Sequence, residues 1–183
     1  MKSTTTSAQG VSMKAVTQDR YGSSEVLRLS DVPVPEPGDH EVLIKVHAAG
    51  LDRGTEHLMT GKPYAMRPAT GLRRPKNPIS GRDVAGTVTK VGSAVTRFAP
   101  GDRVYGVAPG SFAEYAVGPE NKLAHKPAHL TFEQAAVVPI SAGTALQALR
   151  DVGKVQPGQE VLVIGASGGV GSYAVQLAKT FGA

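Results

Sequence analysis

The chain of 183 residues contains no cysteine. This absence excludes disulfides, thiolate metal sites and a cysteine nucleophile. No apolar run is long enough to cross a bilayer, and the first residues lack the apolar stretch of a signal peptide. These absences favour a cytoplasmic protein without a membrane partner.

Aromatic residues are also scarce, at 5% of the chain. The formal net charge of +5 is compatible with an anionic ligand. A nucleic-acid-binding protein would usually gather basic and aromatic residues, and no recognition-helix pattern is present. We therefore expect no nucleic-acid partner, although DNA binding through the positive charge stays an alternative that a salt-sensitive shift would reveal.

The most informative stretch lies near the end of the sequence. The run Val161–Ile164 is apolar and rich in β-branched residues, which predicts a strand buried on both faces of a parallel sheet. Four of the seven residues in 165–171 are glycine, so the backbone there can turn tightly and approach a ligand. Apolar residues then recur at helical spacing from Val170 to Ala178.

A strand, a glycine loop and a helix form a phosphate-binding arrangement. The first turn of a helix has unpaired N–H groups, and the helix dipole places partial positive charge there. A diphosphate accepts these hydrogen bonds where no side chain blocks its approach. The pattern departs from G-x-G-x-x-G because Ala166 takes the first position. The predicted cofactor-binding residues are Ala166, Ser167, Gly168, Gly169, Val170 and Gly171.

The first part of the chain reads as short strands separated by turns. Residues 1–12 are rich in serine and threonine, which predicts a disordered leader, and Met13 is a candidate for the true start. Short strands with frequent glycine and proline turns suggest a compact, mostly antiparallel barrel over residues 13–126. The predicted strands are Lys14–Thr17, Val26–Asp31, Glu41–Leu51, Val84–Val91, Arg103–Tyr105, Ser111–Val117 and Lys122–Lys126.

A basic, proline-rich stretch interrupts these strands at residues 60–80. It contains Arg67, Arg73, Arg74 and Lys76, so one interpretation is a lid that meets an anionic substrate or a cofactor phosphate. The other interpretation is a solvated loop. Tyr64 in this stretch is either a donor to a carbonyl group or a packing residue.

The residues after Pro127 change from strand patterns to helix patterns. Thr131 and Gln134 form a capping-box pattern, and a second helical segment is expected over Ser141–Asp151. We expect residues 127–183 to begin a nucleotide-binding domain. One β-α unit cannot bury its own strand in a parallel sheet, so the sequence also predicts that the chain is an N-terminal fragment of a longer protein.

These stretches together resemble the medium-chain dehydrogenase/reductase superfamily, in its zinc-free quinone oxidoreductase-like branch. The resemblance spans residues 13–183 and implies a GroES-like β-barrel domain followed by the first β-α unit of a truncated Rossmann domain. It rests on Met13–Val16, Val34–Val46, Gly81–Val88, Val91–Gly92, Pro100–Val104, Ala135–Ala136, the glycine loop and Ala178–Lys179.

The resemblance implies an NAD(P)H-dependent enzyme that transfers a hydride to a quinone or an α,β-unsaturated carbonyl compound. Zinc-dependent relatives have Cys, His and Cys ligands where Asp52, Arg82 and Ile140 stand here. Arginine and isoleucine do not ligate zinc, and the five histidines are scattered, so no metal is expected. Without a Lewis acid, quinones and enones fit best because they are easily reduced.

Three further residues receive candidate roles from the resemblance. Asp52 and Arg53 stand where quinone oxidoreductases often have Asn-Pro beside the substrate, so they are the candidate catalytic residues. Asp52 would accept a hydrogen bond or relay a proton, or else it pairs with Arg82, while Arg53 pairs locally. Thr144 would lie near the nicotinamide, or else it only caps the helical segment after Pro139.

The cofactor type is not fixed by these residues. The residue that selects between NAD and NADP lies about 20 residues after the glycine loop, at or beyond the end of the chain. The branch resemblance favours NADP(H), and it allows homo-oligomerisation of the full-length protein. Two alternatives accompany the quinone or enone reductase: a catalytically inactive truncated fragment, and an alcohol dehydrogenase-like activity.

Overall fold

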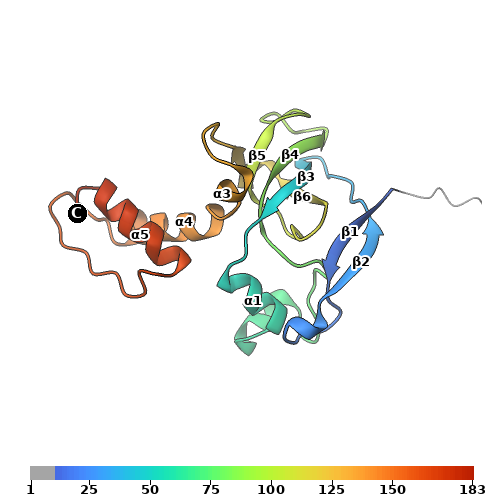
Figure 1. Cartoon of the computed structure of the whole chain (residues 1–183), viewed down its shortest axis with the longest axis horizontal. Coiled ribbons are helices and arrows are strands. Elements are labelled where there is room, and N and C mark those ends of the chain that lie inside the picture. Colours follow the sequence, from blue (N-terminus) through green and yellow to red (C-terminus); the bar gives the residue numbers. More distant parts are fainter. Residues whose placement is uncertain (1–10) are drawn as a thin grey trace, which may run out of the picture.

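A computed structural model describes residues 11–183 of the chain. Residues 1–10, which include most of the predicted leader, lie outside the described part. Figure 1 shows a strand-rich part joined to a helical part that extends to one side, with the β1–β2 hairpin on the opposite side. The strands are β1 (Ser12–Thr17), β2 (Arg28–Pro33), β3 (Glu41–Ala49), β4 (Asp83–Val91), β5 (Arg103–Val107), β6 (Tyr115–Pro119) and β7 (Leu123–His125).

The strand-rich part is antiparallel, as the sequence predicts. Five strands form one sheet in the order β6-β3-β4-β5-β7, and β1 pairs with β2 in a second sheet. The two sheets meet beside β6, where the N–H of Val16 donates to the carbonyl of Phe112 over 2.8 Å. Ser12, which we assigned to the leader, instead belongs to β1 and pairs with Pro33. This arrangement fits the GroES-like expectation.

Alternating apolar residues build the core of the larger sheet. Val42 and Ile44 on β3 are fully buried, whereas Lys45, on the opposite face of the strand, is exposed. Val84 and Val104, on the neighbouring strands β4 and β5, are fully buried in the same cluster. Burying one such side chain contributes about 1.5–3 kcal/mol, so this cluster fixes the sheet that carries the site.

The helical elements begin and end where the sequence places its signals. Thr131 caps α3 (Phe132–Ala136) in a complete capping box with Gln134. Pro139 is the first residue of α4, which continues into a π-helix. Helix α4 covers Pro139–Leu146 and the π-helix η4 covers Gln147–Val152. The other helices are α1 (Arg53–Thr60), α2 (Arg67–Thr70) and α5 (Gly169–Thr180), with short 3₁₀ turns at Ser24–Val26, Tyr64–Met66 and Glu120–Lys122.

Helix α5 packs against α4 and forms a second, smaller core (Figure 1). Its buried residues are Ala145, Leu149, Ala174 and Ala178. Small side chains let the two helices approach closely, which holds the start of α5 beside the start of α4. None of the helices in residues 11–183 has the length and apolar content that a bilayer crossing requires.

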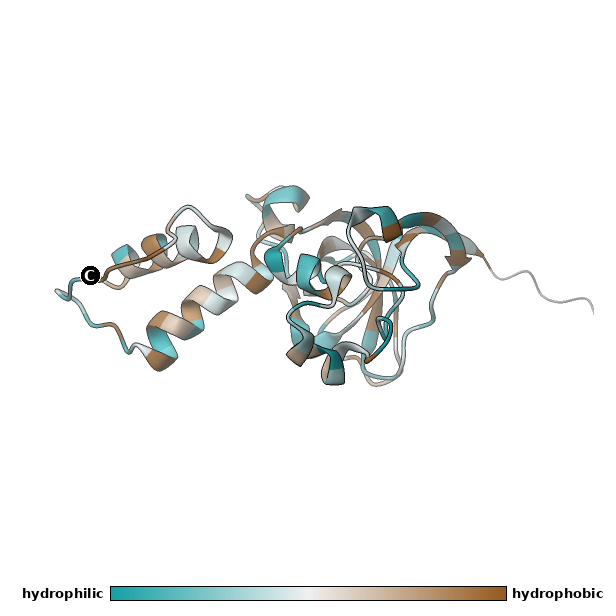
Figure 2. Ribbon diagram, turned by 90° about the horizontal axis from the view of Figure 1, so that it is seen from below, coloured by the Kyte–Doolittle hydropathy of each residue, from teal (hydrophilic) through white to brown (hydrophobic). Residues whose placement is uncertain are grey.

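The expected strand at Val161–Ile164 is not formed. Residues 161–163 have no regular structure, Ile164 already belongs to a turn, and no strand in the described part of the chain pairs with the segment. Val161 and Val163 contact the second core, whereas Leu162 and Ile164 are 87% and 91% exposed. Figure 2 shows this brown, apolar segment on the outer side of the helical part. The expectation of burial on both faces is therefore wrong here, because a parallel strand needs neighbours to bond its backbone.

Candidate functional site

The glycine loop folds into a turn that leads directly into α5. Gly165 has a φ of +78°, a conformation that favours glycine, and its carbonyl accepts a 3.0 Å hydrogen bond from the N–H of Gly168. Gly168 is the N-cap of α5, and no side chain caps this helix. Residues 166–170 are all exposed. The start of α5 is therefore exposed and carries no side-chain cap on its first N–H groups.

Two glycines in the loop make close contacts, and those of Gly171 are with backbone atoms that cannot move aside. A Cβ atom at Gly171 would lie 2.2 Å from the carbonyl oxygen of Gly165, so any side chain there would push the turn open. A Cβ atom at Gly169 would lie 2.9 Å from the hydroxyl oxygen of Ser141 on α4. The first glycine lets the turn fold back on the helix, and the second lets α5 pack against α4.

A cleft of about 780 Å³ joins this loop to the strand-rich part. Gly169 and Val170 form one side of it, and Asp52 and Arg53 form the other. The volume lies within the range of small-molecule sites. The structure therefore brings together four residues that the sequence assigned to the cofactor and the substrate. Other lining residues come from α1, from α4 and from the segments that precede β4 and β6, among them Met59, Ser80, Arg82, Phe112, Ile140 and Ser141.

Asp52 has a structural role in addition to lining the cleft. It is the N-cap of α1, and its Oδ1 accepts hydrogen bonds from the backbone N–H and the hydroxyl of Thr55, both at 2.7 Å. Its Oδ2 accepts a hydrogen bond from Nη2 of Arg82 at 3.2 Å. Burial alone would raise the pKa of Asp52, but the Thr55 bonds and the Arg82 charge outweigh it and lower the pKa. Asp52 is therefore an anion at neutral pH.

Arg53 also has a local partner. Its guanidinium lies 2.5 Å from a carboxylate oxygen of Glu56, one turn along α1. The Asp52–Arg82 pair and a local pairing of Arg53, the alternatives to catalytic roles, are thus both present, with Glu56 as the partner of Arg53. These ion pairs hold the side chains of Asp52 and Arg53 in place where both residues line the cleft.

The three positions at which the resemblance implies zinc ligands in zinc-dependent enzymes come together in this cleft. Asp52, Arg82 and Ile140 all line it. The guanidinium of Arg82 takes the place beside Asp52 that a cation would need. Among residues 11–183, no group of three or more histidine, aspartate and glutamate side chains is arranged to hold a metal ion.

Asp83 is a further residue of interest that the sequence analysis did not single out. It is 3% exposed, and its Oδ1 has no hydrogen-bond partner among the described residues. Burial, together with the nearby charge of Asp52, raises the pKa of Asp83 to about 7. It lines a cavity of about 240 Å³ beside the cleft, opposite Gly169 and Tyr173. No local signal in the sequence marks this burial, because aspartate side chains are rarely buried.

Several predicted site residues lie outside the cleft. Thr144 is exposed in the middle of α4, and its hydroxyl donates to the carbonyl of Ile140 over 2.7 Å. It does not cap the segment, so that alternative is wrong, because α4 already begins at Pro139. Ala166 and Ser167 are exposed in the turn but do not line the cleft, whereas Gly168 caps α5.

None of the basic residues in the stretch 60–80 lines the cleft, to which this stretch contributes only Ser80. Arg74 and Lys76 line a separate cavity next to the β1–β2 hairpin. Tyr64 is 66% exposed, and the guanidinium of Arg67 lies 4.6 Å from the centre of its ring. Tyr64 therefore follows the packing interpretation and contributes nothing to the wall of the cleft.

Comparisons with known proteins agree with this geometry. Residues 38–128 match the model of the alcohol dehydrogenase GroES-like domain. A quinone oxidoreductase from Homo sapiens is 41% identical over 174 residues, which cover 93% of this chain and 50% of that protein. The quinone oxidoreductase structure from Coxiella burnetii superposes with a TM-score of 0.84 at 36% identity, covering 94% of this chain and 55% of that one. The chain belongs to the medium-chain dehydrogenase/reductase superfamily.

Within this oxidoreductase superfamily, the similar proteins include quinone oxidoreductases and an enoyl reductase. The structure of mycobacterial Rv1454c complexed with NADPH has a TM-score of 0.81 at 34% identity, covering 93% of this chain and 51% of that one. The chain spans about half the length of the curated relatives that it matches. The part it shares with them includes both sides of the cleft.

The double role of Asp52 leads to a prediction for stability. Asp52→Ala removes the cap of α1 and leaves Arg82 without its partner, so we expect a loss of about 1–2 kcal/mol in the free energy of unfolding. Asp52→Asn keeps an oxygen that accepts a hydrogen bond from Thr55, and we expect its free energy of unfolding to fall by clearly less than that of Asp52→Ala. Urea denaturation of both variants measures this difference. Equal stability of the two variants would show that the cap contributes nothing.

Proposed function

We propose that this protein is a zinc-independent oxidoreductase that transfers a hydride from NAD(P)H to a quinone or an α,β-unsaturated carbonyl compound. The observation that carries the proposal is the cleft in which the uncapped start of α5 faces the Asp52–Arg82 pair. One side suits a diphosphate and the other side suits a polar organic substrate. The names of the relatives support a quinone as the acceptor.

The residues of the glycine loop fit a dinucleotide. The N–H groups at the start of α5 are exposed, and the absence of side chains at Gly168 and Gly169 leaves room for the diphosphate. The nicotinamide supplies the hydride, and the protein binds and orients it. We favour NADP(H) over NAD(H), and the NADPH-bound neighbour supports a nicotinamide cofactor of this kind.

The donor set in the cleft supports chemistry without zinc. An arginine and an isoleucine stand beside Asp52, and neither provides a zinc ligand. Because Asp52 is ionised and paired with Arg82, it suits the acceptance of a hydrogen bond from the substrate more than the donation of a proton. The guanidinium of Arg82 lines the cleft and its side chain is partly exposed, so its outer N–H groups suit the polarisation of a carbonyl oxygen.

A titration of this chain with NADPH and with NADH tests the cofactor part of the proposal. We expect saturable binding, followed by the change in nicotinamide fluorescence, with NADPH the tighter ligand. Absence of binding by both cofactors would contradict the assignment of the glycine loop. Tighter binding of NADH would overturn only the preference for NADP(H).

Turnover separates the remaining alternatives. With NADPH bound, we expect oxidation of the cofactor when a quinone or an enone is added. Cofactor binding without turnover of either substrate would favour the inactive alternative. Reduction of NADP⁺ by simple alcohols, with no reaction of quinones, would favour the alcohol dehydrogenase-like alternative.

A further inference from the structure

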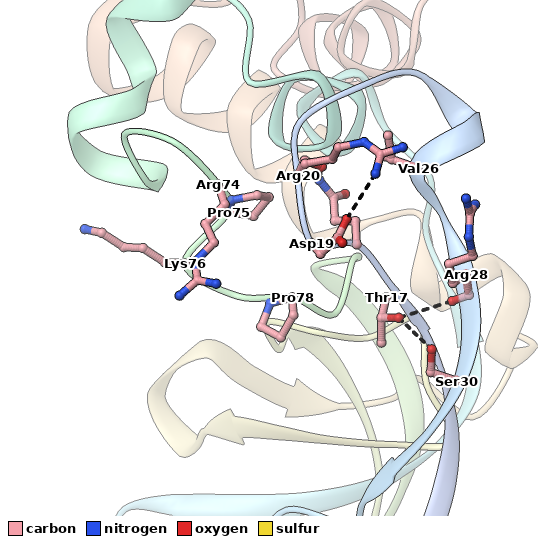
Figure 3. Close-up of a pocket in the computed structure, with 11 residues that line it drawn as sticks. Thr17, Asp19, Arg20, Val26, Arg28, Ser30, Arg74, Pro75, Lys76 and Pro78 are labelled. Atoms are coloured by element: carbon pink, nitrogen blue, oxygen red, sulfur yellow. Dashed lines mark hydrogen bonds and ion pairs between the residues drawn. The ribbon is translucent and has the colours of Figure 1, made fainter.

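A second cavity, of about 580 Å³, lies between the β1–β2 hairpin and the loop at residues 74–78 (Figure 3). It shares no lining residue with the cleft that contains Asp52 and Gly169. Its apolar wall includes Val26, which is 3% exposed, and two prolines, Pro75 and Pro78. The cavity is therefore a separate concave feature of the strand-rich part, and the proposed function does not use it.

Positive charge dominates the rim of this cavity. Arg20 and Arg28 stand on one side, and Arg74 and Lys76 belong to the loop that forms the other side (Figure 3). The lining contains a single carboxylate, Asp19, which lies 3.9 Å from Arg20 and is 84% exposed. Such an exposed pair contributes little. Neither Arg74 nor Lys76 makes an ion pair with any described residue.

Backbone and side-chain hydrogen bonds hold the two sides of the cavity in place. The N–H of Gln18 donates to the carbonyl of Pro78 over 2.8 Å, which joins the hairpin segment to the loop. The buried side chain of Gln18 donates to the carbonyls of Arg20 and Met59, over 3.2 and 3.1 Å. It also accepts a 3.2 Å hydrogen bond from the hydroxyl of Ser80. The base of the cavity is thus ordered before any ligand arrives.

The cationic side chains are also partly oriented. Nη1 of Arg28 donates to the backbone carbonyls of Glu25 and Leu27, the latter at 2.8 Å, which fixes its guanidinium at the rim. The loop that carries Arg74 is closed by a 2.8 Å hydrogen bond from the N–H of Lys76 to the carbonyl of Thr70. Pre-oriented cations lose less entropy when they bind an anion.

We propose that this cavity is a binding site for the phosphate group of a small ligand, separate from the dinucleotide site on α5. Arginine guanidinium groups match the geometry of phosphate oxygens and bind them with two parallel hydrogen bonds. The volume suits a small molecule. No aromatic side chain lines the cavity, so it has no surface on which the bases of a single-stranded nucleic acid would stack.

Titration of the 183-residue chain with inorganic phosphate and with pyrophosphate tests the proposal. Amide NMR shifts report where each anion binds. We expect saturable shifts at residues 17–30 and 74–78, in addition to any shifts at residues 165–171. We expect Arg74→Gln to weaken the binding measured at the first set about tenfold, because it removes one charge-assisted contact. The double variant Arg28→Gln, Arg74→Gln should weaken it further.

Two control variants change the net charge of the chain by the same amount as Arg74→Gln. Arg73→Gln alters the neighbouring residue, which is exposed but does not line the cavity, and Lys45→Gln alters an exposed residue on β3. Both should keep the affinity of the unmodified chain. An equal loss in Arg73→Gln would show diffuse attraction by the loop and would overturn the proposal. Shifts confined to residues 165–171 would overturn it as well.

The outcome is independent of the proposed oxidoreductase activity. Arg74→Gln should leave NADPH affinity unchanged, whereas loss of NADPH binding by the unmodified chain would not alter the phosphate shifts at the second cavity. If an oligonucleotide or an acidic peptide shifted the amide signals of residues 17–30 and 74–78 and pyrophosphate did not, the proposal of a small ligand would be overturned in favour of a macromolecular partner. Arg74 is exposed, so this variant is expected to fold.

Discussion

A Gly171→Ala variant is expected to bind NADPH at least about a hundredfold more weakly than the unmodified chain. The added methyl group would lie 2.2 Å from the carbonyl oxygen of Gly165 and 2.8 Å from Cα of Ala166. Both obstacles are backbone atoms, so the turn must open and the N–H groups at the start of α5 move relative to the diphosphate. Loss of two charge-assisted hydrogen bonds, at about 1.5–3 kcal/mol each, gives at least this factor.

The chain offers a matched control for this variant. Gly143 lies within α4, and a Cβ atom added there would contact nothing within 4 Å. Gly143→Ala should keep NADPH affinity and should raise the free energy of unfolding by about 0.5–1 kcal/mol, because alanine favours the helix. Fluorescence titration and urea denaturation of both variants make the comparison. A Gly171→Ala protein that binds NADPH normally would show that the turn does not hold the diphosphate.

Local signals explain why much of the fold could be predicted from the sequence. Alternation of apolar residues located β3, and turns rich in glycine and proline separated the strands. The capping box at Thr131 located α3, and the four glycines located the start of α5. Each of these signals depends on neighbouring residues and needs no knowledge of distant contacts.

The features that could not be predicted depend on contacts between distant segments. An apolar run such as Val161–Ile164 indicates a strand, but only a partner strand from elsewhere makes one. The cap alternative for Thr144 failed because α4 begins at Pro139, five residues before it. Asp83 acquires its environment from Gly50 and Asp52. A Cβ atom added at Gly50 would lie only 2.9 Å from the Asp83 side chain, and the charge of Asp52 helps to raise the pKa of Asp83. Only the folded chain brings these groups together.

The basic residues at 60–80 show the same limit at a functional level. Their composition suggested either a lid or a solvated loop, and neither interpretation included the β1–β2 hairpin. In the structure, Arg74 faces a cavity whose other side carries Arg20 and Arg28, more than forty residues earlier in the chain. A pattern confined to one stretch does not reveal a site that two stretches share.

The burial of Asp83 predicts a stability that depends on pH. The pKa of Asp83 is about 7 in the folded protein and about 3.8 as an ordinary side chain. Between these values the folded state binds one more proton than the unfolded state, so the free energy of unfolding falls as pH rises. The slope is about 1.4 kcal/mol per pH unit, which amounts to about 2–3 kcal/mol between pH 5 and pH 7. Above the folded pKa this contribution no longer changes.

Replacement of Asp83 by asparagine removes this titration and keeps nearly the same volume. We expect the free energy of unfolding of Asp83→Asn, taken relative to that of the unmodified chain, to be about 2–3 kcal/mol higher at pH 8 than at pH 5. Urea denaturation across this pH range measures the difference. Glu160→Gln, a change at an exposed carboxylate, should leave the pH slope intact. Asp52→Asn should move the slope to lower pH, because the charge of Asp52 helps to raise the pKa of Asp83. An Asp83→Asn protein with an unchanged slope would mean that Asp83 is ionised in its buried position and that another group titrates in this range.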